Sequence, residues 1–387
     1  MRFLVLVLLA LVQATIGMDA AVAQQADAGF VTKARQAYLV EAKTGTVLLA
    51  VNENQAFPPA SLAKLMTMEV VFSALKRREI SAATSFPVTE YAWRNGGAPS
   101  GTTTMFAALN STVSVADLIR GVVIQNANDA CIVLAEGISG SEAEFAARMT
   151  ARAKDLGLSR STFANPTGLP PAESFTTARD LVELARHLHR EYPEQYGLYS
   201  QPDFEWNGIF QRNKNPLLSL NIGIDGLGAG YAKDSGYALV ASIERRGTRL
   251  FLAMGGLASE KERLEEARRV LEWGLSSFET KLLFSPGEVV GQVSVYGGET
   301  RYLDLVAREP VDIYLPTETP PRLSGRIVYQ WPLRAPISEG QAVGMLKISA
   351  DERLVREVEL VAAHPVGSGT LLSKATDALL ELMFFWL

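Results

Sequence analysis

The sequence is poor in the residues that build disulfide frameworks and metal sites. It has one cysteine and three histidines among its 387 residues. A single cysteine excludes a disulfide within the chain, and Cys131 sits in an apolar helical run, which favours a buried, inert thiol. His187, His189 and His364 lack metal-ligand spacing, and the first two stand two positions apart on a predicted helix, so they do not share a face. We therefore expect no metal and no cofactor.

Strong charge of either sign is also absent. The formal net charge is −5, and no basic run suggests that the chain binds nucleic acid. Hydrophobic residues make up 48% of the sequence, which is enough for a substantial core. At roughly 100–200 residues per domain, the length suggests two domains.

Hydrophobic runs long enough to span a membrane are missing as well. At the N-terminus, Arg2 precedes the apolar run Phe3–Val12, and the small-residue triplet Ala21–Ala23 follows. This order is typical of a secretory signal peptide, here residues 1–23, and the apolar run is short for a membrane span. The alternative is an uncleaved anchor. We expect an exported protein whose mature form works outside the cytoplasm.

Residue patterns change character near position 283. Before it, the sequence predicts hairpins at Tyr38–Leu49 and Tyr237–Met254 and several helices, among them Ser61–Arg77 and a helix opened by the capping pair Ser259 and Glu262. After it, short alternating strands follow one another. We expect one domain over 28–282 and a small all-β domain over 283–366. The tail 368–387 ends in ALLELMFFWL, and either lies in a membrane interface or docks on the protein itself.

Ser61 and Lys64 form the sharpest local feature that could carry chemistry. They stand three apart at the start of a predicted helix, so they share a face. A serine hydroxyl is a weak nucleophile until a base takes its proton, and a lysine whose pKa is lowered by burial can be that base. The four letters S-x-x-K are common, and alone they are also consistent with a helix cap and a surface lysine.

Further segments extend this signal along the chain. In order, they are PASLAKLMT, WRNGGAPSGTTTMF, DLIRGVVIQNANDACIVLAEG, FANPTGLP, TTARDL and DGLGAGYAKDSGYALVASIERRGTRL. Together they closely resemble the low-molecular-mass penicillin-binding proteins that act as serine D-alanyl-D-alanine carboxypeptidases. The resemblance covers roughly residues 36–278 and continues more loosely into the β domain and the tail. It implies an α/β (α+β) β-lactamase/transpeptidase-like domain, with an antiparallel sheet and a helical cluster, followed by a small all-β domain and a C-terminal amphipathic helix.

The resemblance also implies three motifs that converge on the active site. The first, S-x-x-K, is present as Ser61 and Lys64. The second, S-x-N, keeps its asparagine as Asn128 but has Asn126 in place of serine. The third, K-T-G, falls on residues 228–230 and keeps only its glycine, as Gly230.

The third-motif positions that differ are Gly228 and Ala229. In the family, the lysine supplies positive charge and the threonine helps to hold the substrate's terminal carboxylate, and neither replacement offers a polar side-chain atom. Asn126 can hydrogen-bond but cannot shuttle a proton. The family's oxyanion hole, two backbone N–H groups, carries over to Ser61 and Tyr231, and Gly230 still lets a substrate approach the strand closely.

Several cations are candidates for the missing lysine. They are Arg212, Lys214 and Lys233, and the sequence does not choose among them; on a regular strand Lys233 would point to the face opposite Gly228. The letters K-T-G also occur at residues 43–45, before the nucleophile. We interpret Lys43 as a solvated lysine in a hairpin turn.

The leading functional hypothesis is a serine-type D-alanyl-D-alanine carboxypeptidase-like protein that acts on peptidoglycan stem peptides through an acyl-enzyme on Ser61. Its partners would be a peptidoglycan pentapeptide with a D-Ala-D-Ala terminus, β-lactams as covalent inhibitors, and a membrane contacted peripherally by the tail. The resemblance further implies a periplasmic location, peripheral on the inner membrane. The alternative is a catalytically impaired homologue that binds cell-wall peptide or a partner protein. A β-lactam hydrolase is a weaker hypothesis, and a phosphate cradle at residues 226–230 is the weakest, because no P-loop lysine follows.

Overall fold

A five-stranded antiparallel sheet forms the centre of the first domain. The computed structural model describes residues 30–170 and 173–371. The strand order is β2-β1-β9-β8-β7, so β7 is an edge strand. The strands are β1 (Gln36–Glu41), β2 (Val47–Val51), β7 (Ile224–Ala232), β8 (Gly236–Arg245) and β9 (Thr248–Leu257).

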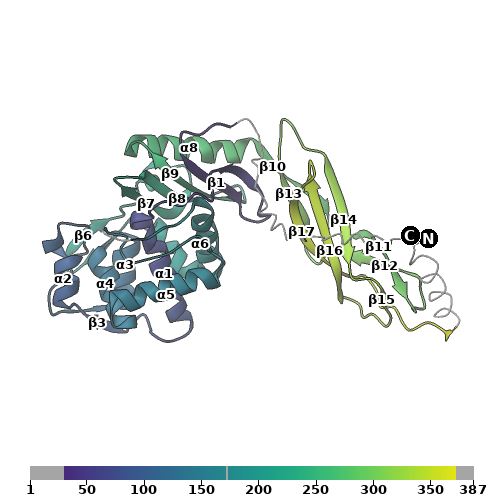
Figure 1. The fold of residues 1–387 in the computed structure, drawn as a ribbon, viewed down its shortest axis with the longest axis horizontal. Coiled ribbons are helices and arrows are strands. Elements are labelled where there is room, and N and C mark those ends of the chain that lie inside the picture. Colours follow the sequence, from purple (N-terminus) through teal and green to yellow (C-terminus); the bar gives the residue numbers. More distant parts are fainter. Residues whose placement is uncertain (1–29, 171–172, 372–387) are drawn as a thin grey trace, which may run out of the picture.

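Helices cover both faces of this sheet (Figure 1). One face is covered by α8 (Glu260–Ser276). The helical cluster on the other face consists of α1 (Ala63–Lys76), α2 (Glu90–Asn95), α3 (Val115–Val123), α4 (Asn128–Ser139), α5 (Glu142–Asp155), α6 (Ala178–Glu191) and α7 (Pro193–Tyr196). Short elements join these parts: η1 (Ala60–Leu62), η2 (Ala98–Ser100), η3 (Gly197–Ser200), η4 (Pro216–Leu220), β3 (Ser85–Pro87), β4 (Thr112–Ser114), β5 (Asp203–Trp206) and β6 (Ile209–Arg212).

Side-chain alternation along β1 explains why the sheet has a hydrophobic core on each of its two faces. Tyr38 and Val40 belong to the core shared with the helical cluster, whereas Ala37 and Leu39 belong to the core beneath α8. Successive residues of a strand point to opposite faces, so a strand covered on both sides is apolar throughout. The predicted hairpins and helices are present, and the Ser259 hydroxyl accepts a hydrogen bond from the Glu262 N–H at the start of α8.

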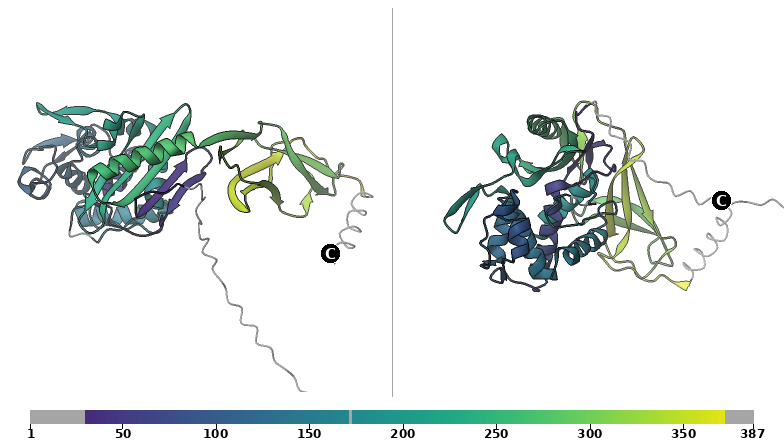
Figure 2. Two further views of the ribbon diagram at one scale, coloured as in Figure 1. Left: turned by 90° about the horizontal axis from the view of Figure 1, so that it is seen from above. Right: turned by 60° about the vertical axis from the view of Figure 1, so that its left-hand side comes forward.

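An all-β domain follows (Figure 2). Its six-stranded sheet has the order β14-β16-β17-β12-β11-β15, and β10 pairs with β13 beside it. The strands are β10 (Phe278–Phe284), β11 (Val289–Tyr296), β12 (Tyr302–Val306), β13 (Val311–Pro316), β14 (Leu323–Tyr329), β15 (Leu333–Arg334), β16 (Ala342–Ala350) and β17 (Arg353–Ala362). A separate hydrophobic core lies within it.

The two domains meet at the turn between β1 and β2. Lys43 forms an ion pair with the buried carboxylate of Asp312 on β13. Arg356 of β17 donates through Nη1 to the carbonyl oxygens of Lys43 and Thr44, at 3.1 and 3.0 Å. Lys43 is in the hairpin turn and 62% of its side chain is exposed, as interpreted, but it also has a partner in the second domain. Its partner stands 269 positions away, which a local turn pattern could not reveal.

The predicted fold class is confirmed: an α/β transpeptidase-like domain is followed by an all-β domain. Cys131 is buried as predicted, and burial raises the pKa of its thiol to about 12. The predicted amphipathic helix lies mostly outside the described residues, which end at Leu371. The exact domain bounds remain a prediction, and β10 runs across the expected boundary between 282 and 283.

Candidate active site

Ser61 lies in the middle of η1, directly before α1. The preceding residue, Ala60, has a φ of 48°, in the left-handed region that residues with a side chain rarely adopt. Gly168 packs against this turn, and a Cβ there would stand 1.8 Å from the carbonyl oxygen of Ala60. Asn165 shapes the Gly168 loop, because its Oδ1 accepts hydrogen bonds from the N–H groups of Thr167 and Gly168. The loop therefore supports the backbone that carries Ser61.

Lys64 is buried beneath the same pocket that Ser61 lines. Its residue is only 5% exposed, and Nζ donates to the carbonyl oxygen of Thr167 at 2.9 Å. Burial lowers the pKa of Lys64, because the charged ammonium loses its hydration. A neutral lysine amine can take a proton, so the pocket combines a hydroxyl with a base.

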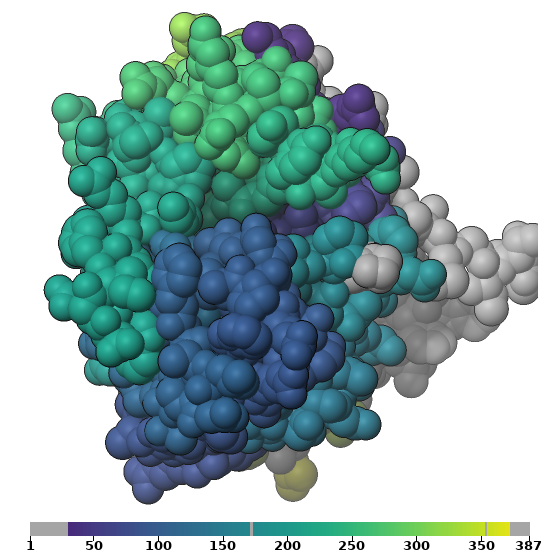
Figure 3. Space-filling view, turned by 90° about the vertical axis from the view of Figure 1, so that its left-hand side faces the viewer, coloured from purple at the N-terminus to yellow at the C-terminus, as the bar shows by residue number. Residues whose placement is uncertain are grey.

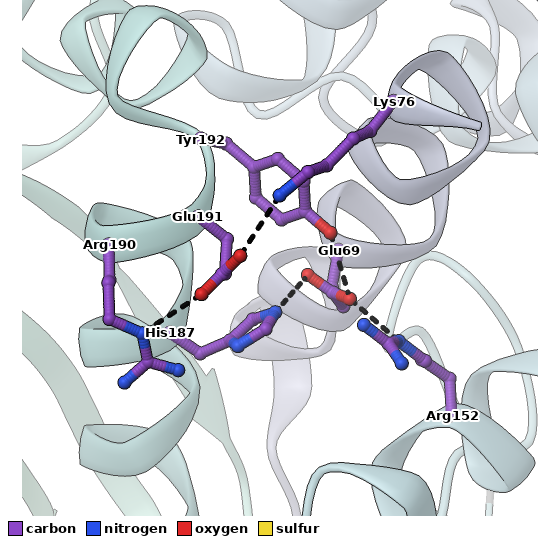
Figure 4. Close-up of polar contacts among 7 residues, drawn as sticks. All are labelled: Glu69, Lys76, Arg152, His187, Arg190, Glu191 and Tyr192. Atoms are coloured by element: carbon purple, nitrogen blue, oxygen red, sulfur yellow. Dashed lines mark hydrogen bonds and ion pairs between the residues drawn. The ribbon is translucent and has the colours of Figure 1, made fainter. Parts of the chain in front are cut away.

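A buried carboxylate anchors the helix that carries Lys64 (Figure 4). Glu69, one and a half turns further along α1, is fully buried, and its Oε1 accepts from Arg152 Nε of α5 at 2.8 Å and from the Tyr192 hydroxyl at 3.2 Å. His187 Nε2 of α6 stands 3.1 Å from the other carboxylate oxygen. A buried charge that loses a partner is costly, so this cluster fixes α1 against two neighbouring helices. No local sequence pattern indicates this cluster, because its members come from separate helices.

The second motif occupies the connection between α3 and α4. Asn126 is half-buried, lines the pocket and has a φ of 60°, a conformation that asparagine tolerates better than most residues. Asn128 begins α4 and is 3% exposed, and its N–H donates to the carbonyl oxygen of Thr103 at 2.8 Å. Its Oδ1 has no hydrogen-bond partner among the described residues. Buried acceptors are normally paired, so this oxygen is an exception, and Asn128 is not among the residues that line the pocket.

The third motif lies on the edge strand β7. Gly228 and Ala229 line the pocket. A Cβ on Gly228 would meet nothing within 4 Å, so this position opens into free space. A Cβ on Gly230 would stand 3.0 Å from the carbonyl oxygen of Pro59, so glycine lets β7 approach η1 closely. The stretch is a strand paired with β8, with Gly228 opposite Val240, and not a phosphate-binding loop.

Tyr231 follows on the same strand, but its side chain is not among those that line the pocket. The residue is 54% exposed, and its ring packs on that of Tyr237 at a centroid distance of 4.6 Å. Any contribution of Tyr231 to the site therefore comes from its backbone N–H. Arg263 of α8, which sequence reasoning missed, donates through Nη1 to the carbonyl oxygen of Gly230 at 3.3 Å and supports the strand from below.

Only one of the three candidate cations lines the pocket. Lys214 lies there together with Ser61, Asn126 and Gly228, whereas Arg212 ends β6 and Lys233 lies in the turn after β7. The backbone N–H of Lys214 donates to the carbonyl oxygen of Ile124 at 2.8 Å, which holds its segment beside the second motif.

The pocket has both polar and apolar lining residues. The polar ones are Ser61, Lys64, Asn126, Lys214 and Asn215. The apolar ones include Leu65, Met68, Val122 and Leu227. Figure 3 shows the end of this domain, where segments of the helical cluster meet those of the sheet. Among residues 30–170 and 173–371, no group of three or more His, Cys, Asp or Glu side chains is arranged to hold a metal ion. Within the same ranges, no helix combines the length and apolar character needed to cross a bilayer.

Two family models and several known proteins are similar to this chain. The family model for D-alanyl-D-alanine carboxypeptidase matches residues 20–256, and that for the C-terminal domain of penicillin-binding protein 5 matches residues 278–368. The D-alanyl-D-alanine carboxypeptidase DacC of Escherichia coli is 33% identical over 91% of this chain and 89% of its own length. The crystal structure of penicillin-binding protein 5 from Haemophilus influenzae is 34% identical and covers 88% of this chain and 99% of its own, with a TM-score of 0.77. A Listeria monocytogenes penicillin-binding protein in an ampicillin-bound form is 27% identical and covers 64% of this chain and 99% of its own, with a TM-score of 0.57.

Proposed function

Because this chain belongs to the D-alanyl-D-alanine carboxypeptidase family, we propose that it is an exported acyl transferase that removes the terminal D-alanine from peptidoglycan stem peptides. The observation that carries this proposal is the shared pocket of Ser61 and the buried Lys64. A nucleophile needs a neighbouring base, and burial makes a neutral lysine accessible.

The reaction proceeds through an ester on Ser61. Its Oγ bonds to the carbonyl carbon of the penultimate D-alanine while its proton passes to Lys64 Nζ. The backbone N–H groups of Ser61 and Tyr231 stabilise the oxyanion. The C–N bond then breaks, and the leaving amine takes the proton from Lys64. Water attacks the ester, gives its proton to Lys64, and the proton returns to Ser61 Oγ.

Two further side chains hold the substrate. Lys214 supplies the positive charge for the terminal carboxylate, in place of the lysine that Gly228 replaces. Asn128 stands two residues from Asn126, which lines the pocket, and its unpaired Oδ1 accepts a hydrogen bond from a substrate amide. Asn126 orients the peptide but relays no proton, because an amide does not exchange one readily.

The substitutions make a slow enzyme the expected outcome. Loss of a general acid–base partner costs on the order of 10²–10⁴ in rate, and loss of a well-placed electrostatic donor costs on the order of 10²–10³. The second candidate function is therefore a catalytically impaired homologue that binds cell-wall peptide. The free space at Gly228 favours it, because no side chain of that residue holds a carboxylate there.

Release of D-alanine from a pentapeptide tests the proposal. Wild-type protein should release D-alanine slowly, and Ser61→Ala should abolish release without altering the fold. Lys214→Gln should lower the rate by about 100-fold, the cost of one electrostatic donor. Arg212→Gln, two positions away and outside the pocket, is the matched control and should leave the rate unchanged. Undiminished release by the Ser61 variant would remove Ser61 as the nucleophile, and binding of pentapeptide without release would favour the second candidate.

A further inference from the structure

The outer face of the all-β domain carries a stripe of tyrosines and arginines at one end. Tyr302 is 52% exposed, and the Arg301 guanidinium lies over its ring at 5.9 Å from the centroid. Tyr296 is half-buried, and the Arg334 guanidinium lies over its ring at 5.5 Å. We call these four residues the tyrosine–arginine stripe.

Strand register places three residues of the stripe on one face, and the fourth, Arg301, directly precedes β12 and lies over the Tyr302 ring. Tyr302 of β12 stands opposite Ser294 of β11, and Tyr296 of β11 stands opposite Arg334 of β15. Residues two apart on a strand share a face, so Ser294 brings Tyr296 and Tyr302 to the same side. The intervening Val295 is buried in the core of the domain. The stripe therefore faces away from that core.

The polypeptide leaves the domain beside this stripe. The turn between β11 and β12 is hydrogen-bonded to the last described segment: the N–H of Glu299 donates to the carbonyl of Gly367, and the N–H of Gly369 donates to the carbonyl of Gly297, both at 2.9 Å. Leu371 is 87% exposed. The sequence beyond it, residues 372–387, ends in the apolar letters LMFFWL.

The stripe also lies away from the first domain. Figure 1 shows β11, β12 and β15 on the side of the all-β domain remote from the helical cluster. Contacts with the first domain are made by Arg356 of β17 and Asp312 of β13, outside the strands that carry the stripe. A flat surface could therefore touch the stripe without touching the active site.

We propose that the tyrosine–arginine stripe binds the headgroup region of an anionic lipid bilayer, as a second contact beside the tail. Tyrosine rings have an apolar body and a polar tip, which suits the membrane–water interface. Arginine side chains extend charge toward anionic headgroups while their stems cover apolar surface. Two carboxylates lie near the stripe and keep their charge, because each accepts from a neutral amide: Glu299 from the Gly367 N–H at 3.0 Å, and Asp304 from Gln292 at 2.7 Å. The proposal is independent of catalysis at Ser61.

A site-specific fluorophore tests the stripe in the full-length chain. Tyr302→Cys, labelled with an environment-sensitive dye, places the probe on the stripe, and the only native cysteine, Cys131, is fully buried and should not react. The matched control is Leu354→Cys, which is 53% exposed at the opposite end of the same domain. With vesicles of mixed zwitterionic and anionic lipid, we expect a blue shift at position 302 and none at 354. A probe at 302 that stays in water while the protein sediments with vesicles would assign binding to the tail alone and overturn the proposal.

Charge removal provides the second arm, without a label. Each arginine near an anionic surface contributes about fivefold to binding, so the pair Arg301→Gln and Arg334→Gln should weaken sedimentation with anionic vesicles by about 25-fold at low salt. Arg326→Gln, on the edge strand β14, is the control and should change little. Equal binding by wild type and the double variant, or no vesicle binding by the full-length chain, would contradict the proposal.

Discussion

Gly228→Lys should increase acylation of Ser61 without harming the fold. Position 228 lies on the edge strand and lines the pocket, and a Cβ there meets no atom within 4 Å. The new side chain therefore has room. Glycine within a strand is itself destabilising by roughly 0.5–1 kcal/mol, so the substitution should not lower the free energy of unfolding.

The expected gain depends on Lys214. A well-placed electrostatic donor contributes on the order of 10²–10³ in rate. Lys214 lines the same pocket, so in wild type Gly228→Lys duplicates a charge and should raise the rate only about tenfold. In a Lys214→Gln background it replaces the lost charge and should raise the rate about 100-fold.

The two backgrounds form a double-mutant cycle. The measured quantity is the rate constant for covalent labelling of Ser61 by a fluorescent penicillin, and circular dichroism verifies that each variant is folded. Adding Ala229→Thr should raise the rate further, because it supplies a hydroxyl for the carboxylate. Asn126→Ser should add less, since serine at a φ of 60° carries a backbone cost of about 1 kcal/mol. Equal gains from Gly228→Lys in both backgrounds would refute the role assigned to Lys214.

Three further predictions follow from the geometry. The acylation rate should rise with pH to a plateau, because Lys64 takes the proton only when it is neutral. The midpoint should lie below the ordinary lysine pKa of 10.5, because burial lowers the pKa of Lys64. A rate that falls with rising pH would exclude Lys64 as the base. Gly168→Ala should slow acylation and destabilise the protein by more than about 2 kcal/mol, because its Cβ would overlap the Ala60 carbonyl. Gly140→Ala is its control, because Gly140 has a similarly positive φ but a Cβ there would meet no atom within 4 Å. If calorimetry shows that both variants lose the same free energy of unfolding, contact with Ala60 is unimportant. Arg356→Gln removes two hydrogen bonds to the first domain and should widen the interdomain distances measured by small-angle scattering, and an unchanged curve would show that they do not set the domain orientation.

Local pattern was sufficient for much of the fold. The spacing of Ser61 and Lys64 predicted that they share a face, and both line one pocket. The capping pair Ser259 and Glu262 correctly predicted the start of a helix. The alternating residues of GLGAG, followed by a predicted hairpin, indicated a strand, and the structure has the edge strand β7 there. In each case the deciding interaction lies within a few residues of the chain.

Contacts between distant segments were not predictable in this way. Lys43 meets Asp312 because a second domain packs on its turn, and no property of the turn itself indicates this. Lys214 could be chosen over Arg212 only once the fold brought its segment to the carbonyl of Ile124. Glu69 is buried among groups from other helices, and its burial gave no local signal.

The most direct test of the central claim is covalent capture at Ser61. Purified full-length protein is incubated with a labelled penicillin, and the adduct is located by intact mass and peptide mapping, with Ser61→Ala as the control. The account predicts one slowly formed adduct, on the peptide that contains Ser61, and none in the variant. A folded wild type that forms no adduct, or an adduct that persists in Ser61→Ala, would contradict it.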